Sequence, residues 1–297
     1  MGDPAQPLKE LAKDKEFLVG IDSDGCAFDT MEIKHKECFI PNIIKYWDLQ
    51  AVSKYAREAG EFVNLYSKWR GINRWPALLM VFDLLEARPE VCKRGVKLPN
   101  VDVLRKWVAE ETKLSNNTLK TLVQTNPDPI LKKALKWSEA VNTEIADMVH
   151  DVPPFPFMRE SLQKLSKTAD AIVCSQTPTE ALAREWQEHE IDGYVKVIAG
   201  QEMGSKSEHL GLAMAGRWEP DHVLMIGDAP GDLKAARDNN CLFYPINPGS
   251  EDASWQRFYE ESWDRFIDGN YSGSYEKALI EEFDKYLPEH PPWEVKA

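Results

Sequence analysis

The part of the chain after residue 157 alternates short apolar runs with helical patterns, and this alternation limits the fold more than any other feature. Strands are expected at 171–175, 195–200, 222–228 and 241–246, with an earlier one at 17–22. Amphipathic helical segments separate the later runs. Short apolar strands joined through helices are typical of a parallel sheet that is covered on both faces. The sequence therefore predicts an α/β fold with a Rossmann-like parallel-sheet core.

Residues 31–150 follow a different pattern, because apolar side chains recur there at helical spacing with few breaks. The proline-rich stretch at 151–157 that follows cannot continue a helix. We therefore expect a discontinuous core domain, residues 1–30 and 151–297, into which an all-helical domain is inserted. An acidic, aromatic extension from about residue 250 is expected to add helices that pack on the core.

Composition excludes several classes of partner. The chain has 297 residues and a formal net charge of −13, which does not suit a protein that binds the phosphate backbone of a nucleic acid. Its five cysteines are scattered and show no spacing typical of a zinc site or a disulfide framework. No apolar run reaches the length of a membrane span, and the first residues do not resemble a signal peptide. We expect a cytoplasmic protein without membrane or nucleic-acid partners, and the oligomeric state stays open.

Chemically reactive side chains follow several of the expected strands. The carboxyl ends of parallel strands meet at one edge of a sheet, where α/β proteins gather their functional groups. Four of these groups are acids, one is a hydroxyl and one is a lysine that begins a helix. They are Asp22, Asp24, Ser175, Lys206, Asp228 and Asp232. The sequence therefore predicts that acids and one lysine converge at this edge.

The order of these residues resembles the haloacid dehalogenase superfamily, specifically its phosphatase-like members with a helical cap inserted after the first motif. The resemblance covers roughly residues 17–246. The four motifs, in the order of the family, are matched by Asp22, Asp24, Gly25 and Asp29, then Ser175, then Lys206, then Gly227, Asp228 and Asp232. Two positions depart from the family pattern: Cys26 stands where Thr or Val is usual, and Gln176 where many relatives have Asn.

The resemblance implies a hydrolase that acts on a small phosphate monoester through an aspartyl-phosphate. In that mechanism Asp22 is the nucleophile, and Asp24 first donates a proton to the leaving alcohol and then accepts one from water. Lys206 and Ser175 bind the phosphoryl group. A small phosphorylated metabolite is the expected partner, and its identity stays open.

The resemblance also implies a Mg²⁺ cofactor, which prefers oxygen ligands. The implied ligands are Asp22, Asp228 and the backbone carbonyl of Asp24, while Asp232 acts through a bound water. The implied phosphate contacts are Ser175, Gln176 and Lys206, together with backbone N–H groups of the turn that contains Ser23 and Gly25. With an ordinary pKa near 4, Asp22 would be ionised at neutral pH without a base.

Three other functions stay open at this point. A phosphomutase would use the same aspartates but return the phosphoryl group to a sugar. A dehalogenase-like hydrolase is a poorer fit, since it would have no use for Asp24. A non-catalytic scaffold is disfavoured by the complete set of motif residues.

The helical insertion contains one stretch rich in cationic and aromatic side chains, "KWRGINRWP" at residues 68–76. Such side chains suit contacts to the part of a substrate that leaves. We therefore expect Arg70 or Arg74 to contact the substrate and to contribute to specificity.

Overall fold

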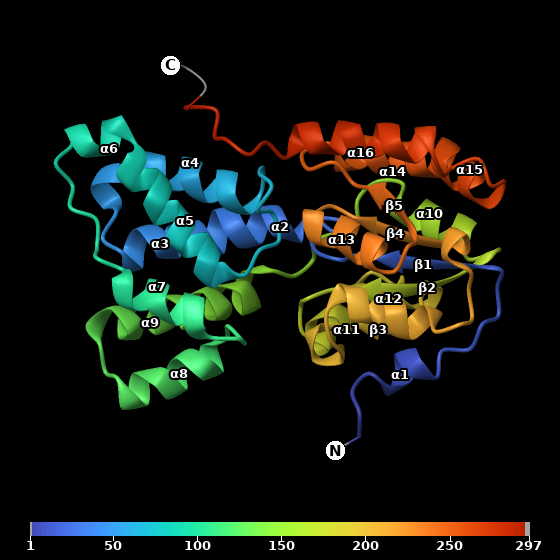
Figure 1. Ribbon diagram of the computed structural model, residues 1–297, viewed down its shortest axis with the longest axis horizontal. Helices are drawn as coiled ribbons and strands as arrows, with labels where there is room; N and C mark the ends of the chain where they lie inside the picture. Colours follow the sequence, from blue (N-terminus) through green and yellow to red (C-terminus); the bar gives the residue numbers. More distant parts are fainter. Residues whose placement is uncertain (1, 295–297) are drawn as a thin grey trace. The chain divides into compact units, whose positions relative to one another are not determined.

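The computed structural model describes residues 2–294, which form two compact units (Figure 1). The core unit contains residues 2–31 and 151–287, and the helical unit contains residues 32–150 and 288–294. The chain therefore passes from one unit to the other three times.

The core unit is built on five parallel strands, which confirms the predicted fold class. The sheet order is β3-β2-β1-β4-β5. The strands are β1 (Phe17–Ile21), β2 (Ala169–Cys174), β3 (Val197–Ala199), β4 (Val223–Gly227) and β5 (Leu242–Pro245). After β1 the chain builds the sheet outward on one side through β2 and β3, then returns to add β4 on the other side. The carboxyl ends of β1 and β4 therefore flank the point where the strand order reverses, the usual position of a ligand site in such sheets.

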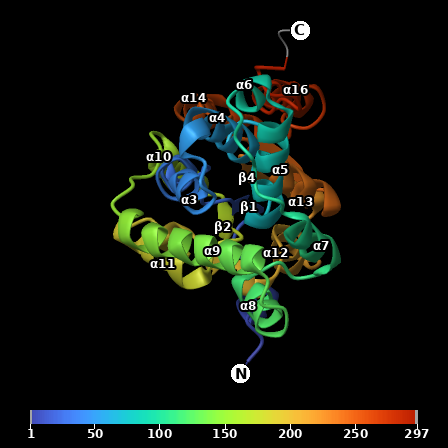
Figure 2. The same ribbon diagram turned by 90° about the vertical axis from the view of Figure 1, so that its left-hand side faces the viewer.

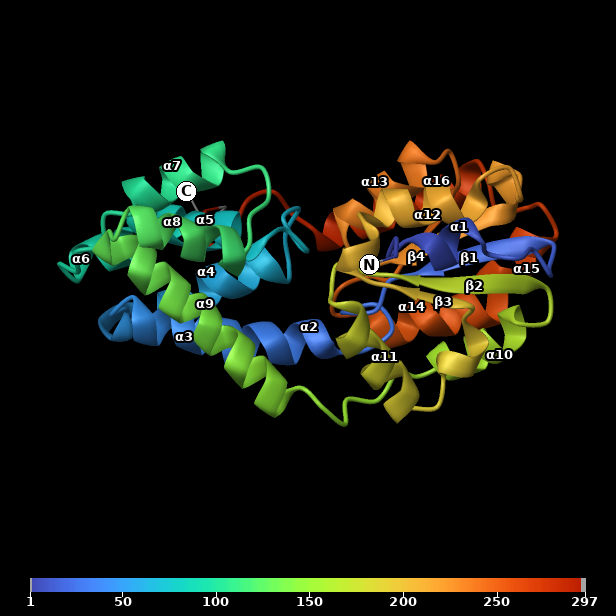
Figure 3. The ribbon, with the colours of Figure 1, turned by 90° about the horizontal axis from the view of Figure 1, so that it is seen from below.

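Helices cover both faces of this sheet (Figure 3). One face packs against α10 (Met158–Leu165), α11 (Thr179–Glu188) and helices from the C-terminal extension. The other face packs against α1 (Gln6–Lys9), α12 (Lys206–Met214) and α13 (Pro230–Asp238). Successive residues of a strand supply opposite faces, so Leu18 belongs to one apolar cluster and Val19 to the other.

The extension after residue 250 adds three helices to the core unit. They are α14 (Glu251–Arg257), α15 (Trp263–Ile267) and α16 (Ser274–Tyr286), with a π-helical turn at Phe258–Ser262. Trp255, Phe258 and Trp263 are fully or almost fully buried in the apolar cluster on the α10 face. These three aromatic residues therefore contribute to the packing of this face.

The same extension seals the outer edge of β5. The Phe243 N–H donates to Glu276 Oε1 at 3.0 Å, and the Phe243 carbonyl accepts from the Tyr271 hydroxyl at 2.7 Å. Both backbone groups lie on an edge strand and have no strand to pair with, and both are buried. Side-chain partners satisfy them and close the edge to further strand pairing.

The helical unit contains the long α9 (Pro129–Met148), and α4 packs against both α3 and α5 (Figure 2). The helices before it are α2 (Thr30–Ile33), a π-helix (Lys34–Phe39), α3 (Ile40–Tyr46), α4 (Ser53–Asn64), α5 (Arg74–Ala87), α6 (Pro89–Lys93), α7 (Asp102–Glu110) and α8 (Asn116–Thr125). At its centre the Trp75 ring lies edge-on to Trp107 and Trp137, with ring centroids 5.2 and 5.7 Å away. Within residues 2–294, no helix is both long and apolar enough to cross a membrane.

Residues 288–294 differ from the expectation that the whole C-terminal extension belongs to the core domain. The Trp293 ring lies edge-on to Phe62, with centroids 5.8 Å apart, and covers the guanidinium of Arg88 at 4.4 Å. The Lys68 N–H donates to the Pro288 carbonyl at 3.3 Å. These contacts make the end of the described chain a part of the helical unit.

The sealed edge of β5 gives a prediction for stability. Glu276→Leu removes the acceptor of a buried backbone N–H, so the free energy of unfolding should fall by about 1–3 kcal/mol. Glu276→Gln keeps an acceptor oxygen and should lose clearly less. Urea unfolding followed by tryptophan fluorescence measures both variants, and equal losses would contradict the proposed role of the acceptor.

Candidate active site

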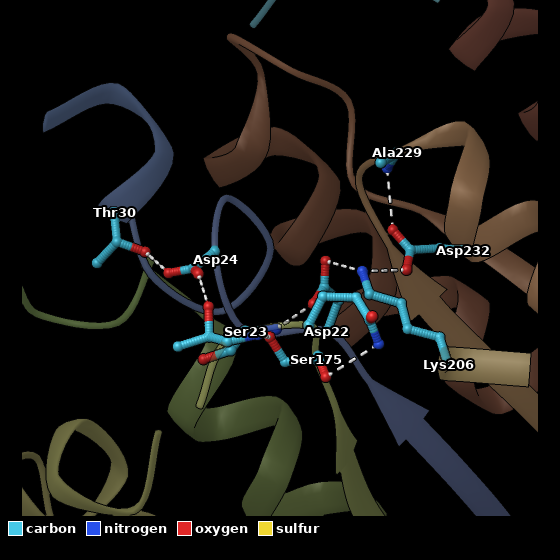
Figure 4. A network of polar contacts seen from close by, with 10 residues as sticks. Asp22, Ser23, Asp24, Thr30, Ser175, Lys206, Ala229 and Asp232 are labelled. Atoms are coloured by element: carbon cyan, nitrogen blue, oxygen red, sulfur yellow. Dashed lines mark hydrogen bonds and ion pairs between the residues drawn. The ribbon is translucent and has the colours of Figure 1, made fainter. Parts of the chain in front are cut away.

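Lys206 links two of the predicted site acids. Its Nζ lies 2.7 Å from Asp22 Oδ2 and 2.6 Å from Asp232 Oδ1 (Figure 4). Lys206 is the first residue of α12, which begins behind Ser205, a cap whose hydroxyl accepts from the Glu208 N–H. The parallel sheet therefore brings a lysine from after β3 to acids that follow β1 and β4.

Three acids form a compact buried cluster around this lysine. Asp22, Asp228 and Asp232 are 4%, 1% and 0% exposed, and one carboxylate oxygen of each lies within 4.8 Å of the others. One lysine cannot balance three ionised carboxylates, so the cluster attracts a further cation. The donor atoms are all oxygens, the type that Mg²⁺ prefers. The residues present therefore fit the magnesium site that the sequence predicted.

The electrostatics of the cluster correct one expectation. Burial raises the pKa of Asp22 well above its ordinary value, and the charges of Asp232 and Asp228 raise it further, while Lys206 opposes the shift. The expectation of an ordinary pKa near 4 is therefore wrong, because the side chain has lost its water. Burial would by itself lower the pKa of Lys206, but the nearby carboxylates raise it well above the usual range. Asp22 depends on cations close by for its ionisation.

The position of Asp232 leaves room only for glycine at residue 227, the end of β4. A Cβ atom on Gly227 would lie 2.3 Å from the Cβ of Asp232, far inside van der Waals contact. Asp232 is fixed from its other side, since Oδ2 accepts from the Ala229 N–H at 3.1 Å. The absence of a side chain at residue 227 thus lets Asp232 reach Lys206.

Asp24 has different partners from Asp22. Its carboxylate oxygens accept hydrogen bonds from the hydroxyl groups of Thr30 and Thr177, the second at 2.6 Å. Figure 4 shows the Asp24 carboxylate directed to Thr30, while Asp22 is directed to Lys206. Neither threonine was predicted from the sequence as a site residue. Their closeness in the chain to the motif residues could have indicated them. Thr30 directly follows Asp29, the last aspartate of the first motif, and Thr177 lies two residues after Ser175.

Two of the backbone N–H groups predicted to bind phosphate already have partners within the chain. The Ser23 N–H donates to Asp22 Oδ1 at 2.8 Å, and the Gly25 N–H donates to the Phe28 carbonyl at 2.8 Å. Gly25 has a φ of +77°, which only glycine adopts readily. A phosphate group would have to displace these hydrogen bonds, so the predicted role of both N–H groups stays a prediction.

The two predicted phosphate contacts after β2 lie at the same edge of the sheet. The Ser175 hydroxyl accepts from the Thr177 N–H at 3.2 Å, which fixes its position directly after the strand. Gln176 Nε2 donates to the Gly204 carbonyl at 3.1 Å, so this amide joins the end of β2 to the loop before α12. The hydrogen bond to Gly204 gives the Gln176 side chain a structural role. Contact between Gln176 and phosphate stays a prediction.

Cys26 has the surroundings of a structural residue. It is fully buried in the apolar cluster on the α10 face. Burial raises the pKa of its thiol well above the ordinary value, and the charges of Asp228 and Asp22 add to the shift. The thiol therefore stays protonated and packs as a small apolar group.

Of the two arginines predicted to select the substrate, Arg70 is buried and Arg74 is half-buried within the helical unit. Arg70 is 4% exposed and donates to the Leu65 carbonyl at 2.8 Å. Arg74 donates to Ser138 Oγ at 2.9 Å and to Asn142 at 2.7 Å, and burial lowers its pKa to about 10. These partners give both guanidinium groups a role in the packing of the unit. Substrate contact by either stays a prediction.

Comparison with known families supports the interpretation of the motifs. The family model described as "Haloacid dehalogenase-like hydrolase" matches residues 98–245. The match includes Ser175, Lys206 and Asp228, and it begins after the first motif. Together with the parallel sheet and the order of the motifs, it shows that the chain belongs to the haloacid dehalogenase-like hydrolases. The protein is therefore a hydrolase by family, and no curated protein matches it.

Several solved structures resemble the chain at low identity. A haloacid dehalogenase-like family hydrolase from Streptococcus pneumoniae is 14% identical, covers 82% of this chain and 91% of its own, and has a TM-score of 0.44. A predicted phosphoglycolate phosphatase from Haemophilus somnus is 15% identical, with coverages of 78% and 86% and a TM-score of 0.47. CbbY from Rhodobacter sphaeroides, solved with phosphate, is 16% identical, with coverages of 78% and 86% and a TM-score of 0.42. None of these similarities assigns a substrate.

The contact between residue 227 and Asp232 gives a prediction. Gly227→Ala should lower the free energy of unfolding by about 1–3 kcal/mol, because the added methyl group must push Asp232 away. Gly231→Ala, four residues later, is the matched control. A Cβ there meets nothing within 4 Å, so thermal unfolding should be unchanged or slightly improved. Equal stability of both variants would show that the site tolerates movement of Asp232.

Proposed function

We propose that this protein is a Mg²⁺-dependent phosphatase that hydrolyses a small phosphate monoester through an aspartyl-phosphate on Asp22. The observation that carries the proposal is the Lys206 ammonium between Asp22 and Asp232, inside a buried cluster of three carboxylates. A dianionic phosphate cannot approach such a cluster without cations. Lysine supplies one, and the all-oxygen donor set suits a divalent metal as the other.

The chain's own residues divide the proposed chemistry between them. An Asp22 oxygen attacks phosphorus, the bond from phosphorus to the ester oxygen breaks, and Asp24 donates a proton to that oxygen. Water then attacks the phosphorus of the aspartyl-phosphate, and Asp24 takes its proton. Inorganic phosphate leaves and the Asp22 carboxylate is restored. To take part, the Asp24 carboxyl group exchanges its bonds to Thr30 and Thr177 for bonds to the substrate.

Three carboxylates would hold the metal ion, those of Asp22, Asp228 and Asp232. When bound, Mg²⁺ supplies positive charge that offsets the repulsion between these carboxylates and the phosphoryl oxygens. Asp232 already accepts hydrogen bonds from Lys206 and Ala229, which suits the role through a water molecule that the family resemblance implies. The Asp24 carbonyl completes the proposed ligand set.

The proposed substrate is a small phosphorylated metabolite, and we propose a cytoplasmic location. The net charge of −13 is unfavourable for a large polyanionic substrate. Release of inorganic phosphate to water distinguishes the proposed hydrolysis from phosphoryl transfer to a sugar.

The division of labour between two aspartates gives a prediction. Asp22→Asn should abolish formation of the aspartyl-phosphate, because a neutral amide is a poor nucleophile. Asp24→Asn should keep the fold and metal but lose the proton transfer, so turnover should fall about 100-fold or more. Phosphate release from a panel of phosphorylated metabolites and a generic aryl phosphate measures both. Near-normal turnover by Asp22→Asn would rule out the mechanism.

Removal of the metal gives a second prediction. A chelator should abolish hydrolysis and Mg²⁺ should restore it, whereas Ca²⁺, with its longer and less directional bonds, should support it poorly. Mg²⁺ should also raise the melting temperature of the protein, since it binds only the folded site. Asp228→Asn should lose that increase. Asp238→Asn, on the surface of α13, should keep it, and full activity in chelator would exclude a metal-dependent reaction.

A further inference from the structure

The turn that carries Asp22 and Asp24 is held by two buried tryptophans from other elements. This segment, residues 22–28, is called the motif-one turn. Its own backbone bonds centre on the Ser23 carbonyl, which accepts N–H groups from Cys26 at 3.3 Å, Ala27 at 2.9 Å and Phe28 at 3.1 Å. These bonds close the turn on itself, and bonds from elsewhere fix it against the rest of the core unit.

The first tryptophan holds the residue between the two aspartates. The Trp186 indole N–H, on α11, donates to Ser23 Oγ at 3.0 Å, and the Ser23 hydroxyl donates to Glu185 at 3.1 Å. The Trp186 ring also lies edge-on to Phe28, with centroids 5.9 Å apart. Ser23 is completely buried, so its side chain is fixed from two directions without competition from water.

The second tryptophan holds the far side of the turn. The Trp255 indole N–H, on α14, donates to the Cys26 carbonyl at 2.7 Å. Both residues are fully buried. Trp255 lies beyond residue 245, where the match to the hydrolase family ends. The C-terminal extension therefore contributes a hydrogen bond directly to the motif-one turn.

This arrangement matters because the two aspartates need different orientations. Asp22 is directed to Lys206, and Asp24 is directed to Thr30 and Thr177. Ser23 lies between them in the chain, so a rotation of its backbone would move both carboxylates. Misplacement of a reacting group by about 1 Å can cost about 100-fold in rate.

We propose that Trp186 and Trp255 are positioning residues that hold the motif-one turn in its reactive conformation. The inference rests on the proposed function, since it assigns the two indoles to the reaction of Asp22 and Asp24. It also gives the C-terminal extension a use beyond packing.

The test compares Trp186→Phe and Trp255→Phe with Trp263→Phe. Each change keeps an aromatic ring and removes an indole N–H. Trp263 is the matched control, because it is buried in the same cluster but packs against Phe17 and Phe266. The measurements are melting temperature, kcat and KM for an aryl phosphate with Mg²⁺, and the backbone amide resonances of residues 23–28 by NMR.

The two positioning variants should lower kcat about 10-fold or more while KM stays within about threefold, because the loss concerns the reacting groups. Trp263→Phe should keep kcat within about threefold even at an equal loss of melting temperature. The amide resonances of the turn should shift in the first two variants only. If Trp255→Phe does not fold, the kcat, KM and amide resonances of Trp186→Phe test the proposal alone.

Unchanged kcat and unchanged turn resonances in both positioning variants would overturn the proposal, as would equal effects of Trp263→Phe. If the parent protein hydrolyses no phosphate ester, the proposed function is wrong. The amide resonances then decide by themselves whether the two indoles hold the turn.

Discussion

The ion pairs of Lys206 are the interaction on which the rest of the site depends. Asp22, Asp228 and Asp232 are removed from water, and three such carboxylates repel one another strongly at the distances observed. A buried acid cluster without a cation would either take up protons or open the structure. Lys206, the first residue of α12, supplies a fixed positive charge. The parallel sheet places it beside the acids, because the carboxyl ends of its strands meet at one edge.

The motif-one turn separates two carboxylates that are only two residues apart. Asp22 lies within the acid cluster, whereas Asp24 accepts hydrogen bonds from two threonine hydroxyls. Asp22 thus faces charged groups, while Asp24 accepts from two neutral hydroxyl groups. This difference in surroundings supports the proposal that Asp22 attacks phosphorus and Asp24 transfers the proton.

The C-terminal extension connects several parts of the molecule. It supplies Glu276 and Tyr271 to the edge of β5, and Trp255 to the Cys26 carbonyl. It then crosses to the helical unit, where Trp293 stacks on Arg88. A segment outside the family match therefore contacts, in chain order, the motif-one turn, the edge of the sheet and the helical unit.

The strands and the residues that follow them were predictable from the sequence, because both are recorded in local patterns. Apolar runs predicted the strands β1 to β5. Because the carboxyl ends of parallel strands meet at one edge of the sheet, the residues that follow them, Asp22, Lys206 and Asp228, must lie at that edge. Tertiary structure decided everything that depends on burial and on distant partners. The raised pKa of Asp22 follows from its lost hydration, and the partners of Asp24 follow from the path of two loops. Likewise the internal bonds of Arg74 depend on α9, more than 60 residues later in the chain, and no local pattern encodes such a contact.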